Sequence, residues 1–127
     1  RSEVLKQALD NGATIEDLRE NDPGRKAILP ELVEAMRQQN VGYPVIDGFQ
    51  IPLKKVKRIG NFPKGSTQLV LASDGYPKLL PTLEATEAYL KRCLQNDPLC
   101  IKRHKATKGL KPGSQSFDDR AYIRIEL

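Results

Sequence analysis

A continuous run of apolar residues, LVLA at positions 69–72, is the feature that most constrains the fold of this chain. The run does not alternate with polar residues, which is typical of a β-strand that is buried on both faces. It ends at Ser73, and Asp74 and Gly75 follow at once. Asp-Gly is a common turn pair, and a carboxylate at a strand end is also a common metal ligand. The sequence therefore predicts a core strand over residues 67–73 and leaves both roles open for Asp74.

A second strand and several helices follow from the periodicity of the other segments. In residues 119–127 apolar side chains alternate with polar ones, which predicts an amphipathic strand. Apolar residues spaced three and four apart predict helices elsewhere. Together these segments predict an α+β fold in which helices pack on an antiparallel sheet. The further expected elements are helices over residues 2–9, from residue 14, over 25–39 and over 81–96, and strands over 43–46 and 55–59.

The chain is basic, because 21 Lys and Arg residues against 16 Asp and Glu residues give a net charge of +5. Two clusters hold much of the excess, residues 54–58 and residues 101–105, and the second contains Lys102, Arg103 and Lys105. Such clusters are either solvated surface or a means of attracting phosphorylated and other polyanionic partners. Few aromatic residues interleave with these lysines, which argues against a surface for single-stranded nucleic acid.

The sequence indicates a cytoplasmic protein that does not enter the membrane. No apolar segment approaches the ~20 residues of a membrane-spanning helix, and the charged residues 1–10 are not typical of a signal peptide. Cys93 and Cys100 are expected to be free, buried thiols. The only histidine, His104, has no Cys or His partners at the spacing of a zinc site. The Lys108-Gly109 pair is too sparse for a phosphate-binding loop.

A second acidic segment, Asp118 with Asp119, precedes the C-terminal strand. Adjacent carboxylates repel one another unless a cation or hydrogen-bond donors compensate, so the segment is either a solvated loop end or a cation site. If the strand that ends near Asp74 pairs antiparallel with residues 119–127, the end of one lies beside the start of the other. Asp74 and Asp118 would then meet at one edge of the sheet, as two ligands of a metal site do.

These residues carry a resemblance to a known family. The segment TQLVLASDGYPKLL, followed by a helix, a loop and SFDDRAYIRIEL, resembles the C-terminal half of the type 2C (PPM-type) metal-dependent serine/threonine protein phosphatases, in their bacterial-like branch. The resemblance implies that Asp74 and Asp118 are ligands of a dinuclear Mn²⁺ or Mg²⁺ centre. It also implies that Gly75 is required by the turn and that Asp119 has a supporting role. The sheet would be part of a β-sandwich flanked by helices.

The same resemblance implies an activity, the hydrolysis of phosphoserine or phosphothreonine in protein substrates by a metal-activated water. Residues 1–127 would be a single C-terminal part of the catalytic domain, inactive without the N-terminal half of that domain as its partner. Two other functions stay open. The chain would be a pseudophosphatase or regulatory domain if Asp74 and Asp118 only make turns, or a binding module for polyanions if its basic clusters are functional.

Overall fold

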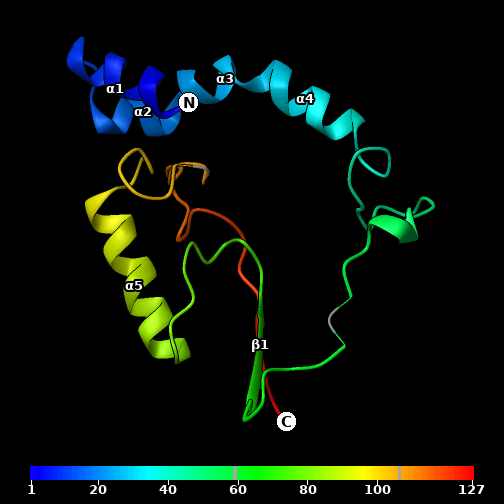
Figure 1. Ribbon diagram of the computed structural model, residues 1–127. Coiled ribbons are helices and arrows are strands. Elements are labelled where there is room, and N and C mark those ends of the chain that lie inside the picture. The colour runs from blue at the N-terminus through cyan, green and yellow to red at the C-terminus, as the bar shows by residue number, and fades with distance from the viewer. Residues whose placement is uncertain (59, 106) are drawn as a thin grey trace. The chain divides into compact units, whose positions relative to one another are not determined.

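The computed structural model describes residues 1–58, 60–105 and 107–127, which form two compact units. The first unit combines Arg1–Ala27 with Thr67–Leu127, and the second unit is Ile28–Ser66. The described residues form five α-helices, one short 3₁₀ helix and a two-stranded antiparallel sheet (Figure 1). This is a small α+β fold, as the sequence predicts. Among the described helices, none has the length and apolar character needed to cross a membrane.

Local sequence signals explain the first two helices. α1 (Ser2–Asp10) is followed by Gly12, which takes a φ of +93°, a left-handed conformation that glycine adopts without strain. α2 (Ile15–Glu20) begins with a capping box. Its Thr14 hydroxyl accepts a hydrogen bond from the Asp17 N–H, and the Asp17 carboxylate accepts one from the Thr14 N–H, both at 3.1 Å. Both helices lie where the sequence predicts them.

α5 (Leu83–Asn96) is the longest helix among the described residues. Its first turn is capped by Thr82, whose hydroxyl accepts a hydrogen bond from the Ala85 N–H at 3.1 Å. Its buried stripe includes Thr86 and Leu90, which are at most 1 % exposed. The prediction of a helix that starts after Pro81 is therefore confirmed.

The sheet consists of β1 (Gln68–Ala72) and β2 (Tyr122–Glu126), which pair antiparallel with Leu71 opposite Ile123. Both strands and their expected pairing are confirmed. The expectation that β1 is buried on both faces is wrong for the described residues, because Leu71 is 52 % exposed and Ile123 is 57 % exposed. The described sheet has only these two strands, and its apolar face is partly exposed. A β-sandwich stays a prediction.

The core of the first unit is divided into two clusters, and the segment after α5 contributes to both. Leu99 and Ile101 enter one cluster, whereas the intervening Cys100, at a φ of +49°, enters the other. Both cysteines are free thiols, and Cys100 is buried while Cys93 is half-buried. The buried members are Leu5, Leu18, Leu99 and Ile101 in the first cluster, and Leu90, Cys100 and Phe117 in the second.

The second unit departs most from the sequence-based expectation. The helix expected over residues 25–39 is divided in two, and α3 (Pro23–Ala27) belongs to the first unit. α4 (Leu29–Arg37) starts anew with Pro30 in its first turn, where a missing N–H costs nothing. The strands expected over residues 43–46 and 55–59 are absent from the described part of this unit, and Ile59 lies outside it.

Proline explains part of this difference. Pro44 and Pro52 cannot donate hydrogen bonds to a strand ladder. The chain after Pro52 instead forms a single 3₁₀ turn, η1 (Leu53–Lys55). Pairing near Pro44 is limited to an isolated bridge between Gln39 and Tyr43 among the described residues.

Candidate functional site

The end of β1 lies beside the start of β2. The acidic segment that follows β1 and the one that precedes β2 are therefore neighbours. Beyond the last ladder pair, the Ser73 N–H donates to the carbonyl of Ala121 at 3.1 Å. The Ser73 hydroxyl donates to the carbonyl of Asp119 at 3.2 Å and accepts from the Ala121 N–H at 3.0 Å. This serine therefore fixes the backbone of the Asp74 turn to the backbone of the Asp118-Asp119 segment.

Gly75 makes that approach feasible because it has no side chain. It is buried, and a Cβ at this position would lie 2.2 Å from the carbonyl oxygen of Asp119, far inside the contact distance of the two atoms. That oxygen is held by the hydrogen bond from Ser73, so it cannot move away without loss. The sequence assigned Gly75 to a tight turn. In the structure, its absent Cβ makes room for the second acidic segment.

Asp74 itself is exposed, and its side chain lies beside basic residues. It lines a cavity of about 550 Å³ together with Arg103, His104 and Lys105. The predicted anion-attracting residues Lys102, Arg103 and Lys105 are all exposed, and two of them face this cavity. The arrangement places positive charge beside Asp74.

Asp118 is half-buried and already has a cationic partner. Its Oδ1 lies 2.7 Å from Nζ of Lys108, and it also accepts a hydrogen bond from the Asp119 N–H at 3.0 Å. The hydrogen bond from Lys108, followed by that from the Asp119 backbone, holds the pKa of the Asp118 carboxyl below its usual value. The carboxylate is thus ionised and available as an oxygen ligand. Asp119 is exposed, and its backbone groups support the site through Ser73 and Asp118.

The geometry brings the two candidate ligands onto neighbouring backbone segments. Asp74 and Asp118 stand on backbone segments that are in contact, but their side chains line separate cavities. Within the described residues, no group of three or more His, Cys, Asp or Glu side chains is placed to hold a metal ion. Mg²⁺ and Mn²⁺ prefer oxygen ligands in octahedral sites, so the donor chemistry of two carboxylates fits while the ligand number falls short. Further ligands are required.

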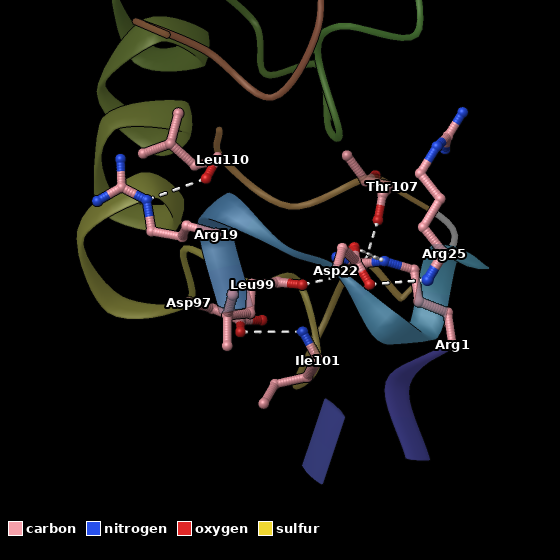
Figure 2. Close-up of polar contacts among 9 residues, drawn as sticks. All are labelled: Arg1, Arg19, Asp22, Arg25, Asp97, Leu99, Ile101, Thr107 and Leu110. Atoms are coloured by element: carbon pink, nitrogen blue, oxygen red, sulfur yellow. Dashed lines mark hydrogen bonds and ion pairs between the residues drawn. The ribbon is translucent and has the colours of Figure 1, made fainter. Parts of the chain in front are cut away.

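Three residues order this region through contacts that the sequence pattern does not predict. Asp97 follows α5, and its carboxylate accepts hydrogen bonds from the N–H groups of Ile101, Lys102 and Arg103 at 2.9–3.2 Å. Arg1 and Arg19 donate to backbone carbonyls of the loop that follows (Figure 2). The Asp97-Pro98 pair after a helix is a sequence signal for a turn, whereas the two arginines depend on contacts over long sequence separations.

His104 has a structural environment of its own. Its Nε2 lies 2.8 Å from the hydroxyl oxygen of Tyr89, and the two rings meet edge to face. The tyrosine hydroxyl thus occupies the hydrogen-bonding position of Nε2.

Comparison of the chain with protein-family models, with curated proteins and with solved structures found no match. A relationship to the type 2C phosphatases stays a prediction that depends on the resemblance of the two acidic motifs.

Proposed function

We propose that this chain is the C-terminal part of the catalytic domain of a type 2C metal-dependent protein phosphatase. The observation that carries the proposal is the packing of Gly75 on the Asp119 carbonyl, because it joins the Asp74 turn to the Asp118 segment. A turn with no role beyond reversing the chain has no need to place an aspartate against a second acidic segment. The proposed substrates are proteins that carry phosphoserine or phosphothreonine.

In this proposal each acidic residue has a distinct role. Asp74 and Asp118 provide carboxylate ligands to a dinuclear Mn²⁺ or Mg²⁺ centre, which lowers the pKa of a water nucleophile and neutralises charge on the phosphoryl group. Gly75 and Ser73 hold the two ligand segments in contact. Asp119 donates its N–H to Asp118 and thereby orients that carboxylate.

The remaining ligands would come from the N-terminal half of the domain. The apolar face of the sheet supports this arrangement, because an exposed pair such as Leu71 and Ile123 is typical of a surface that another layer covers. We infer that the same partner half buries this face and completes the ligand shell. The chain without that half is then expected to be inactive.

One observation favours a second candidate, a non-catalytic domain of the same fold. The ion pair between Lys108 and Asp118 neutralises the carboxylate without any metal ion. A pseudophosphatase or regulatory domain would keep such a pair as a purely structural contact. Metal binding separates the two functions, since only the phosphatase requires Asp74 and Asp118 as ligands.

The deciding experiment measures Mn²⁺-dependent hydrolysis of a phosphothreonine peptide by the full-length protein that contains this chain. Asp74→Asn should lower kcat/KM roughly 100-fold or more, because metal catalysis supplies several kcal/mol of transition-state stabilisation. Asp10→Asn is the matched control, since Asp10 is an exposed aspartate on α1. Mn²⁺ binding is followed in parallel by electron paramagnetic resonance.

The outcomes are distinct. Activity in the wild type and the control, with loss of both activity and Mn²⁺ binding in Asp74→Asn, supports the phosphatase. A wild type that neither binds Mn²⁺ nor hydrolyses the peptide refutes it and favours the non-catalytic domain. Binding of polyanions that is abolished by charge reversal at Lys102, Arg103 and Lys105, without any hydrolysis, would favour the polyanion module instead.

A further inference from the structure

A cavity with a mostly cationic rim lies directly beside Asp118. It has a volume of about 550 Å³, and its lining includes Lys108, Lys111 and Arg120 as well as the carboxylates of Asp118 and Asp119. This volume lies in the range of small-molecule sites in proteins. Arg120 is paired with Glu87 at 3.5 Å, so Lys108 and Lys111 are the cations left to the cavity. Two lysines beside Asp118 are suited to an anion that would also contact a metal ion held by that carboxylate.

Lys108 is the cation of this cavity whose position is best fixed. Its neighbour Thr107 accepts a hydrogen bond from Arg1 through the backbone carbonyl at 3.2 Å. On the other side, the carbonyl of Leu110 accepts one from Arg19 at 3.0 Å, and the Leu110 N–H donates to the carbonyl of Pro98 at 2.7 Å. Backbone contacts therefore hold the loop on both sides of Lys108.

The burial of Arg1 strengthens this support. Its side chain is only 6 % exposed and lies 2.7 Å from the Asp22 carboxylate. Gly109 permits the arrangement, because a Cβ there would lie 2.8 Å from Nη2 of Arg1. Gly109 thus makes room for Arg1, and the neighbouring Lys108 lines the cavity.

Ser116 belongs to the lining of the same cavity. Its hydroxyl oxygen is buried and has no hydrogen-bond partner among the described residues, so the side chain would have to rotate to present it to a ligand. Phosphate oxygens accept hydrogen bonds from hydroxyl and ammonium groups alike.

We propose that this cavity binds the phosphoryl group of the substrate and that Lys108 is its principal cation. The proposal rests on the proposed phosphatase function. With Asp118 engaged as a metal ligand, the charge of Lys108 is no longer compensated by that carboxylate alone. The phosphoryl group then offers a counter-charge, and Lys108 exchanges its partner from Asp118 to substrate. The ion pair with Asp118 keeps the Lys108 side chain beside the site until substrate binds.

The test uses the full-length protein with Mn²⁺ and compares Lys108→Met, Lys108→Arg and the control Lys91→Met, an exposed lysine on α5. Four quantities are measured for each variant. They are kcat and KM for a phosphothreonine peptide, the inhibition constant of inorganic phosphate, and the dissociation constant of Mn²⁺.

Lys108→Met should weaken phosphate inhibition and raise KM by about 10-fold each, because one charge-assisted contact to the phosphoryl group is lost. Mn²⁺ should bind at least as tightly, since a competing cation has gone. Lys108→Arg should restore both constants to within about threefold, and Lys91→Met should change neither. A merely structural lysine would leave the phosphate constant unchanged.

Two results would overturn the inference while leaving the phosphatase intact. One is phosphate inhibition within twofold of wild type in Lys108→Met, and the other is a loss of Mn²⁺ affinity equal to the loss of phosphate affinity. If the wild type does not turn over at all, direct calorimetric titration with inorganic phosphate decides. If phosphate binds and Lys108→Met weakens that binding, the anion site stands without the phosphatase function. If phosphate does not bind, both the anion site and the phosphatase function are refuted.

Discussion

Gly75 is the residue at which a single added carbon has the most direct effect on the site. A Cβ would lie 2.2 Å from the Asp119 carbonyl oxygen, which is itself held by Ser73. We expect Gly75→Ala to lower the free energy of unfolding by roughly 1–3 kcal/mol through overpacking. Urea denaturation of the purified protein measures the change.

The control for this prediction is Gly60→Ala. A Cβ at Gly60 would meet no heavy atom within 4 Å, so that variant should be close to wild type in stability. If Gly75→Ala is no less stable than Gly60→Ala, the close approach between the β1 turn and the Asp119 backbone is wrong. The argument that joins the two acidic segments would then fail as well.

Cys100 provides a second prediction for a single residue, based on its ionisation. Desolvation by burial, with a smaller contribution from the Asp97 charge, raises the pKa of this thiol from 9.0 to about 12. At pH 8 its thiolate fraction is then about 1,000-fold below that of an unshifted thiol. In a Cys93→Ser variant, the remaining thiol should react with a disulfide reagent far more slowly in the folded protein than in urea.

The same shift sets a pH window for stability. Because the folded state keeps the proton to a higher pH than the unfolded chain does, the contribution of the protonated Cys100 is complete below about pH 9 and is lost as the pH rises towards 12. Rapid labelling of Cys100 in the native state at pH 8 would contradict its burial.

At the scale of elements, the segment after α5 is ordered by one carboxylate. The two oxygens of Asp97 accept hydrogen bonds from Ile101 on one side and from Lys102 and Arg103 on the other. Asp97→Asn retains one acceptor but replaces the other with an amide donor. We expect it to lose about 1–3 kcal/mol of stability and to increase hydrogen exchange at the amides of Lys102 and Arg103.

Asn96→Asp is a suitable comparison for that variant. Asn96 is exposed at the end of α5, and its side chain donates only to the Arg92 carbonyl. Loss of that surface contact should cost less than loss of the Asp97 contacts. Equal stability of Asp97→Asn and wild type would show that the loop is held by other contacts, such as those from Arg1.

Some elements can be predicted from the local sequence and others cannot, and the reason is physical. The boundaries of α2 and α5 follow from capping residues that lie within the same turn, so a short window of sequence contains the whole cause. The pairing of β1 with β2 also follows, because two apolar segments have few other partners. The strands expected over residues 43–46 and 55–59 have no partner strand among the described residues, and sequence periodicity cannot supply one.

The candidate site is predictable to the same extent. The sequence indicates Asp74 and Asp118 as candidates because each lies close to a strand end, and the register of the two strands places their backbone segments together. Lys108 was not found as a partner of Asp118, since its position depends on hydrogen bonds from Arg1 and Arg19 across most of the chain. Long-range side-chain contacts of this kind leave no local pattern.

At the scale of the whole molecule, the chain forms two compact units, whereas the sequence predicts that all 127 residues belong to one phosphatase domain. These two statements do not conflict. The units describe where contacts are dense within this chain. Membership of a single larger domain stays a prediction, and so does a cytoplasmic location. What the structure does show is an apolar sheet face that the described residues leave open.

That face gives the last prediction. Leu69, Leu71, Ile123 and Ile125 lie on one side of the sheet in cross-strand pairs, and three of them are more than 40 % exposed. Residues 1–127 produced alone should bind a hydrophobic dye and self-associate at micromolar concentration, because an open apolar strand pair offers a surface for other chains. Light scattering and dye fluorescence measure both effects.

Two lysine variants of β1 test whether this face is the cause. Leu71→Lys places a charge on the apolar side and should reduce dye binding and association, whereas Gln68→Lys places the same charge on the opposite side and should leave both unchanged. Adding the N-terminal half of the domain should suppress dye binding if that half covers the face. If the wild-type chain is monomeric and binds no dye, the exposed face does not drive association. The incomplete set of metal ligands would then be the remaining argument for a covering layer.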